Sequence, residues 1–147
     1  MTSRNLLSGA AAGIMLAACA YPMPRVDAVQ DCRSNECFVS VTVLPGTTGP
    51  CILEVDFNTV RVDPDGNNPQ AGKIIKWQFA PGTTNAAFTE NDGIRFDPNS
   101  RITCQRTGNG AGYQCENARS TGTWKYDVNA TSENARCETF DPYVVNP

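Results

Sequence analysis

The 147-residue sequence contains no histidine, and this absence excludes several kinds of chemistry. Hydrolases with a Ser-His or Cys-His pair need an imidazole to accept the proton of the nucleophile. The common zinc sites and the blue-copper sites use imidazole ligands. An enzyme built from this chain would depend on carboxylates, Lys, Tyr or a hard metal ion. We therefore expect neither an enzyme nor a bound cofactor.

Basic residues are few and scattered along the chain. Twelve Lys and Arg residues stand against 15 Asp and Glu residues, which gives a formal net charge of −3. No cluster forms the basic patch that nucleic-acid-binding proteins present to phosphates. No polybasic run of the kind that binds anionic lipids is present either. The charge pattern therefore predicts no nucleic-acid partner.

Long apolar runs are absent after the first 18 residues. Leu6–Ala18 is an apolar stretch that follows Arg4 and ends in small residues. A charged start, a short apolar segment and small residues at its end are typical of a secretory signal. The stretch is shorter than the roughly 20 residues that a membrane-spanning helix needs. Residues 1–18 are therefore predicted to be a signal peptide.

The end of this segment carries a specific motif. Leu16-Ala17-Ala18-Cys19 resembles the lipobox of bacterial lipoproteins, which implies cleavage before Cys19 and attachment of lipid to this cysteine. Two or three acyl chains anchor a protein stably, because each buried methylene contributes about 0.8 kcal/mol. Ala20 stands where lipoproteins retained in the inner membrane carry Asp. The resemblance thus implies the outer membrane, on its periplasmic leaflet or at the cell surface. An ordinary signal peptide with an incidental Cys19 is the alternative.

Residues 19–31 are expected to form a short tether. Pro22 and Pro24 interrupt any periodicity, and polar residues follow them. An extended chain rises ~3.1 Å per residue, so about ten residues reach ~30 Å from the membrane surface. The sequence is thereby divided into a signal peptide (1–18), a lipidated tether (19–31) and one domain (32–147).

Six cysteines remain once Cys19 is set aside. An even number of cysteines in an exported chain indicates up to three disulfides. Metal binding is the alternative, but the chain has no histidine and no Cys-x-x-Cys motif. The six disulfide candidates are Cys32, Cys37, Cys51, Cys104, Cys115 and Cys137.

These six cysteines have fifteen possible pairings. A Gly-rich segment between Cys104 and Cys115 favours a hairpin, which would place the two cysteines opposite each other at its base. Cys32 and Cys37 would then close a small loop. The pair that remains is Cys51 with Cys137.

Alternation of apolar and polar side chains runs through the predicted domain. Val39 and Val41 share one face of a strand, while Ser40 and Thr42 lie on the other. Similar alternation occurs at residues 51–57, 75–79 and 124–130, and residues 143–145 are expected to form a closing strand. Turn residues separate about eight to ten such strands, which favours a single all-β sandwich.

One short segment adds a resemblance. Tyr113-Gln114-Cys115 resembles the tyrosine corner of immunoglobulin domains, in which a tyrosine precedes a cysteine by two residues. The upstream Asp of that motif is missing, and Trp77 lies too far beyond Cys51 for the usual spacing. Residues 74–79, 93–96, 126 and 141–146 are also similar to segments of small exported immunoglobulin-like proteins of Gram-negative bacteria. The resemblance implies a Greek-key sandwich and carries no function.

The turn at Asp63, Asp65 and Asn67 is the one weak candidate for a metal site. Its oxygen ligands have the spacing of a calcium loop. An EF-hand loop has Gly at its sixth position and Glu at its twelfth, whereas here Gly66 is fourth and Ile74 is twelfth. A plain hairpin turn is the favoured interpretation, and we expect no metal.

Two further groups of side chains have a functional and a structural interpretation. Glu90, Asp92 and Asp97 would be an acid–base set only if two of them met in a pocket, and acidic turn residues are more often solvated. Aromatic residues on the alternating strands would line a glycan-binding or peptide-binding face, but their positions favour the core. These aromatic residues are Trp77, Trp124 and Tyr126.

The loops Pro81–Asp92 and Gln105–Gly112 are long for hairpin connections and rich in Gly, Thr and Asn. Binding residues often lie on loops that a rigid scaffold positions, so these loops are candidate functional surfaces. Tolerated insertions are the alternative. We expect a membrane-anchored, non-catalytic module that binds a protein or glycan partner, including an inhibitor-like role. A structural component of an envelope or surface assembly is the other hypothesis.

Overall fold

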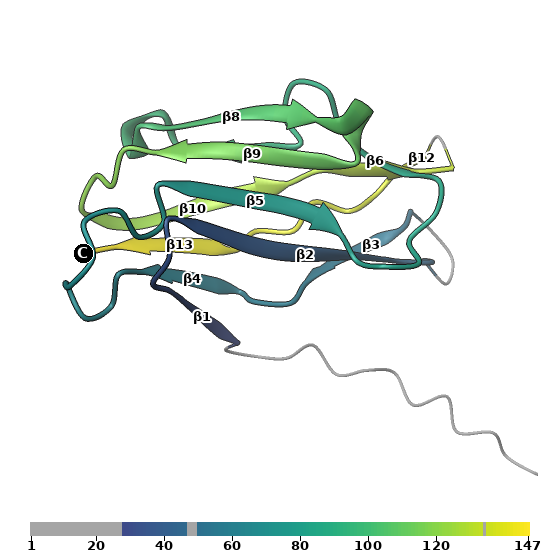
Figure 1. Ribbon diagram of the computed structural model, residues 1–147. Coiled ribbons are helices and arrows are strands. Elements are labelled where there is room, and N and C mark those ends of the chain that lie inside the picture. The colour runs from purple at the N-terminus through teal and green to yellow at the C-terminus, as the bar shows by residue number, and fades with distance from the viewer. Residues whose placement is uncertain (1–27, 47–49, 134) are drawn as a thin grey trace, which may run out of the picture.

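Strands form nearly all of the regular structure, because apolar residues alternate with polar ones along short segments between turns. The computed structural model describes residues 28–46, 50–133 and 135–147, which form two facing β-sheets (Figure 1). The predicted signal peptide, Cys19 and residues 20–27 of the tether lie outside this part of the chain. No helix within it is long and apolar enough to cross a membrane. The expected all-β sandwich is confirmed.

The first sheet has five strands and includes the longest strand described. Its order in space is β3 (Ile52–Val55), β2 (Glu36–Leu44), β5 (Ile74–Phe79), β9 (Gly112–Asn117) and β8 (Ile102–Thr107). Strands β2 and β5 run parallel, with Val39 opposite Trp77, and the other pairs are antiparallel. The short 3-10 helix η2 (Gly108–Gly110) turns β8 into β9.

The second sheet also has five strands and lies behind the first (Figure 1). Its order in space is β1 (Val29–Cys32), β4 (Thr59–Val62), β13 (Tyr143–Asn146), β10 (Gly122–Val128) and β7 (Ile94–Phe96). The 3-10 helix η1 (Pro98–Ser100) follows β7. A small sheet continues the second sheet past Asn129. It consists of β12 (Ala135–Arg136), β11 (Ala130–Ser132) and β6 (Ala86–Phe88).

The strand expected at residues 143–145 is present as β13, and it lies inside its sheet. Strand β13 lies between β4, which runs parallel to it, and β10, which runs antiparallel. It occupies the middle of the second sheet, and its Val144 packs in the core with no exposed surface. Both main sheets therefore contain parallel pairs, which connect strands distant in the sequence.

The domain begins earlier than residue 32. Strand β1 starts at Val29 and pairs in parallel with β4, with Val29 opposite Thr59. Asp31 forms an ion pair with Arg61, with 2.7 Å between its Oδ1 and the guanidinium Nη2. Residues 29–31, predicted as tether, are therefore part of the sandwich, because β4 offers a free edge to pair with.

The predicted disulfide pairing is confirmed. Cys104 and Cys115 are directly opposed on β8 and β9, with a Cα–Cα distance of 4.0 Å. Cys32 pairs with Cys37 and Cys51 pairs with Cys137. The two short bridges join cysteines that are close in sequence, whereas Cys51–Cys137 connects the segment before β3 to the segment after β12.

The likeness to a tyrosine corner does not extend to its contacts. The Tyr113 hydroxyl donates to the Glu90 carbonyl at 3.1 Å, on a segment remote in sequence. Cys115 pairs with its hairpin neighbour within one sheet and does not bridge the two layers. Tyr113 therefore anchors the Glu90 turn to the first sheet.

Aromatic side chains fill the space between the sheets. Trp77 of the first sheet packs edge-on against Tyr126 and Phe96 of the second, with ring centroids 5.3 and 6.1 Å apart. Phe88 of β6 is fully buried as well. At one end, Asn117 and Asn146 exchange side-chain hydrogen bonds of 2.9 and 3.1 Å across the layers. Buried amides satisfied in this way join the sheets without an unpaired polar group.

Candidate functional site

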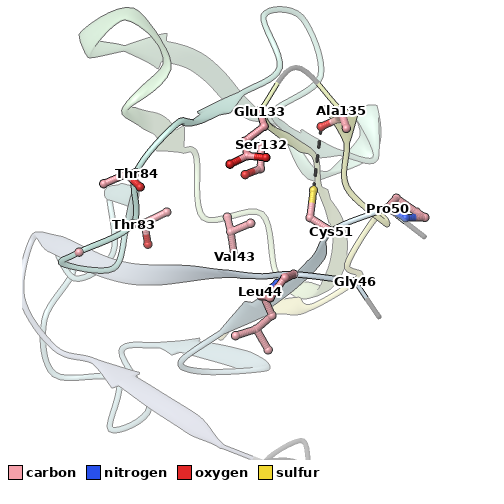
Figure 2. Close-up of a pocket in the computed structure, with 12 residues that line it drawn as sticks. Val43, Leu44, Gly46, Pro50, Cys51, Thr83, Thr84, Ser132, Glu133 and Ala135 are labelled. Atoms are coloured by element: carbon pink, nitrogen blue, oxygen red, sulfur yellow. Dashed lines mark hydrogen bonds between the residues drawn. The ribbon is translucent and has the colours of Figure 1, made fainter. Parts of the chain in front are cut away.

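A cavity of about 490 Å³ lies at the end of the sandwich near β3, β6 and β12 (Figure 2). We call it the loop-end pocket. Its described lining comes from residues 43–46, 50–51, 82–84, 132–133 and 135. The lining residues used below are Val43, Cys51, Thr83, Thr84, Ser132 and Glu133.

Local backbone geometry shapes two sides of the pocket. Gly82 has φ of +87°, a conformation that glycine adopts without strain, and it turns the chain after β5. Glu133 has φ of +50° at the turn between β11 and β12. Its backbone N–H donates to the Asn85 carbonyl at 3.0 Å. The two loops are therefore joined to each other beside the pocket.

The Cys51–Cys137 disulfide holds the third side. Its Cys51 Sγ lies 3.9 Å from the Ala135 carbonyl oxygen, a contact without a shared proton, since a disulfide sulfur carries none (Figure 2). The Glu138 N–H also donates to the Cys51 carbonyl at 2.8 Å. The segment after β12 is thus fixed to the residue before β3 by a covalent bond and a hydrogen bond.

The described lining of the pocket is mostly uncharged. Val43 points into it from the end of β2, and the Thr84 and Ser132 hydroxyls lie on opposite sides, while Leu44 points away (Figure 2). Glu133 is the one ionisable side chain among the described lining residues. General acid–base catalysis by a carboxylate pair needs two such groups. The described lining offers apolar contact and hydrogen bonds instead.

Sequence reasoning found part of this site. Thr83 and Thr84 belong to the predicted functional loop Pro81–Asp92. Ser132 and Glu133 were missed, because nothing local marks them as a binding turn. The signal that could have found them is the Cys51–Cys137 pairing, which brings the residues before Cys137 to the loop before β3.

In the candidate metal turn, both carboxylate oxygens of Asp63 are bound by donors of the protein itself. Asp63 is 5% exposed, and its Oδ1 accepts the backbone N–H groups of Asn67 and Asn68 at 3.1 and 3.0 Å. Its other oxygen pairs with Arg119 at 3.2 Å, while Asp65 pairs with Arg33 at 3.3 Å. Over the described ranges, no three His, Cys, Asp or Glu residues are grouped to hold a metal ion. Asp63 therefore stabilises the turn itself.

The other candidates lie apart from each other or in the core. Asp97 accepts the Asn99 N–H as the cap of η1, whereas Asp92 pairs with Arg136. Trp77 and Tyr126 are each 1% exposed, so they pack the core as the alternation favoured. Trp124 is partly buried and donates its indole N–H to the Ser120 carbonyl at 2.8 Å.

Asp92 is the carboxyl with the clearest electrostatic role. The Thr89 hydroxyl, which donates to it, and Arg136, at 2.9 Å, hold its pKa below the ordinary value of 3.8. Asn129 supports this arrangement, because its side-chain amide donates to the Asp92 carbonyl at 2.7 Å and its oxygen accepts from Arg136. This cluster fixes the turn before β7 to β11 and β12.

The lowered pKa of Asp92 predicts a pH dependence of stability. Because the unfolded carboxyl binds protons more readily, the stabilisation is present above about pH 4 and is lost as the pH falls further. We expect Asp92→Asn to lower the unfolding free energy at pH 7 and to flatten its decline toward pH 3. Urea unfolding at several pH values measures both effects. Glu138→Gln, at an exposed carboxyl, is the control and should leave the decline unchanged.

No protein-family model matches this chain, and no curated protein matches it in sequence. The function proposed for it therefore rests on the chemistry of its own residues.

Proposed function

We propose that the protein is a membrane-anchored, non-catalytic binding module that faces the periplasm or the cell surface. The lipobox Leu16–Cys19 supports the anchor, and an outer-membrane location follows from Ala20. Three disulfides support export, because such bonds persist in oxidising compartments and are rare in the cytosol. The lipobox and the disulfides support export independently.

The loop-end pocket is the observation that carries the binding role. Its three sides are joined by the Glu133–Asn85 hydrogen bond and the Cys51–Cys137 disulfide. A site fixed before its partner arrives loses less conformational entropy on binding. Its volume of about 490 Å³ falls in the range of ligand-binding cavities.

A segment of a protein partner fits this pocket better than a glycan. Its described lining combines aliphatic groups, as at Val43, with the hydroxyls of Thr84 and Ser132 and with loop backbone. No aromatic side chain stands among these residues to stack on a sugar ring. An inhibitor-like role, in which the anchored domain holds a loop of another exported protein, agrees with this chemistry.

The anchor is tested by replacing Cys19. In a Gram-negative host, we expect the full chain in the membrane fraction and Cys19→Ser in the soluble fraction. Mass spectrometry of the wild-type protein should find residues 1–18 removed and acyl chains on Cys19. A chain with an unmodified Cys19, or a Cys19→Ser variant that stays with the membrane, would refute the anchor.

The pocket is tested by photocrosslinking in cells. A photoreactive residue at Thr84 should give one discrete protein adduct, and the same residue at Ala118, exposed at the opposite end, should not. Ser132→Arg should reduce the Thr84 adduct about tenfold by filling the pocket. Equal adducts from both positions, or none from either, would show that the pocket is not the binding site. Thermal unfolding checks that each variant remains folded.

A further inference from the structure

The outer face of the first sheet carries a second set of side chains arranged for binding. Across strands β2, β5, β9 and β8, Phe38 lies opposite Lys76, Lys76 opposite Gln114, and Gln114 opposite Gln105. Because side chains alternate between faces, these four share the face that points away from the core. One row of this sheet therefore presents an aromatic ring, a cation and two amides, in that order from β2 to β8.

The neighbouring row contains a glycine that leaves space. Ser40, Gln78, Gly112 and Thr107 lie opposite one another in that order. A hollow of about 300 Å³ lies over Gly112, and Phe38, Gln78 and Thr107 line it. A Cβ on Gly112 would lie 2.8 Å from Thr107 Oγ1 and 3.3 Å from the Trp77 carbonyl oxygen. Residue 112 therefore lines the hollow with backbone alone, and a Cβ there would crowd Thr107 and the Trp77 carbonyl.

Phe38 is an exposed ring with a fixed neighbour. With 47% of the residue exposed, it is one of four large apolar residues that are exposed in the described part of the chain. The Lys76 ammonium lies 5.5 Å from the ring centroid and pairs with Glu36 at 2.7 Å. The cation is thus neutralised by Glu36, and the ring is held at the rim of the hollow.

The amides beside this ring have no partner of their own. The side chains of Gln78, Gln105 and Gln114 form no hydrogen bond or ion pair within the described chain. Each offers two N–H donors and a carbonyl acceptor in one plane. Such groups match the neighbouring hydroxyls of a sugar, while an aromatic ring packs against its C–H face. Free amides around an exposed ring therefore favour a carbohydrate.

The opposite sheet shows that this composition is local. The outer face of the second sheet carries ion pairs, including Arg61–Asp31 and Arg95–Asp127, both at 2.7 Å. On the first sheet the lining of the hollow has Lys76 as its one charged side chain among the described residues, and Glu36 neutralises it. A neutral ligand is accordingly favoured over an anion or a cation.

We propose that the Phe38 hollow binds a neutral glycan, with one sugar ring stacked on Phe38 and its hydroxyls bonded to Gln78 and Gln114. The row continues to Gln105 on β8, so further sugar units would extend across the sheet. This site is separate from the loop-end pocket and does not depend on the protein partner proposed there. Thr107 and Gly112 belong to the loop Gln105–Gly112, which the sequence indicated as a second functional surface.

The test is calorimetric titration of the full chain, purified from membranes in detergent, with soluble oligosaccharides. The neutral probes are hexamers of cellulose, xylan, mannan and chitin, and a galacturonate hexamer is the charged comparison. We expect saturable binding of at least one neutral hexamer at up to about 1 mM, and none of the charged one. Failure of every neutral hexamer to bind, or preference for the charged one, overturns the proposal.

Matched variants locate the binding. Phe38→Ala should weaken it about tenfold or more, and Gly112→Ala should weaken it by filling the hollow. Phe38→Trp should retain it. Tyr143→Ala removes an aromatic residue, 42% exposed, from the second sheet and should change nothing. Equal loss in the Phe38 and Tyr143 variants refutes the site, whereas an unaffected Ser132→Arg separates it from the loop-end pocket. Unfolding curves confirm that each variant is folded.

Discussion

Replacing Cys51 and Cys137 together by alanine is expected to lower the free energy of unfolding by about 4 kcal/mol. The two cysteines are separated by 86 residues, so their bond removes more conformational freedom from the unfolded chain than either other bridge. The bond also joins the start of β3 to the segment after β12, which hydrogen bonding alone connects weakly. Loss of this bridge should also loosen the loop-end pocket.

Urea unfolding of the full chain measures the loss. The matched comparison is Cys104→Ala with Cys115→Ala, a pair 11 residues apart in a hairpin that β8 and β9 already hold together. For this pair we expect about 3 kcal/mol. The photocrosslink at Thr84 should weaken only when Cys51–Cys137 is removed. A larger destabilisation from the hairpin pair would contradict the argument from loop length.

Trp77→Ala is expected to lower the unfolding free energy by about 3–5 kcal/mol, the range for a large aromatic residue in a core. Trp77 is 1% exposed on β5 and contacts the rings of Tyr126 and Phe96 on the other sheet. Its indole N–H also donates to the Tyr126 hydroxyl at 3.2 Å. The substitution therefore opens a cavity between the layers and removes a hydrogen bond at once.

Trp77→Phe separates these two effects. It keeps a ring between the layers but leaves the buried Tyr126 hydroxyl without its indole donor, at a cost of about 1–3 kcal/mol. Adding Tyr126→Phe should recover part of that loss, because no unpaired hydroxyl remains. Trp124→Ala, at a partly buried position, should destabilise less than Trp77→Ala. Equal losses of unfolding free energy at the two tryptophans would show that the contact between the layers adds no stability beyond that of a partly buried tryptophan.

Alternation in the sequence predicted which residues face the core. Val39, Val41 and Trp77 are all buried on the face that their spacing indicated. Alternation reports the face of a side chain and says nothing of the direction of the neighbouring strand. The parallel pairing of β2 with β5, and the central position of β13, could therefore not be read from it.

The two proposed binding surfaces were only partly predictable for a similar reason. The two Gly- and Thr-rich loops were recognised, and each borders a cavity. Phe38 gave no signal, because one apolar residue on the polar side of a strand is common in proteins. Phe38 was proposed as a binding residue because Lys76, Gln114 and Gln105 lie in the same row. Only the register of four strands shows this arrangement.

The central position of β13 has a consequence for how the domain is assembled. Residues 143–146 separate β4 from β10, so the second sheet stays in two parts until these residues are available. A chain that emerges N-terminus first, from a ribosome or through a translocation pore, cannot complete this layer before residue 146 has appeared. Until then β4 and β10 present unpaired edges, which is where a chaperone would be needed and where premature aggregation would begin.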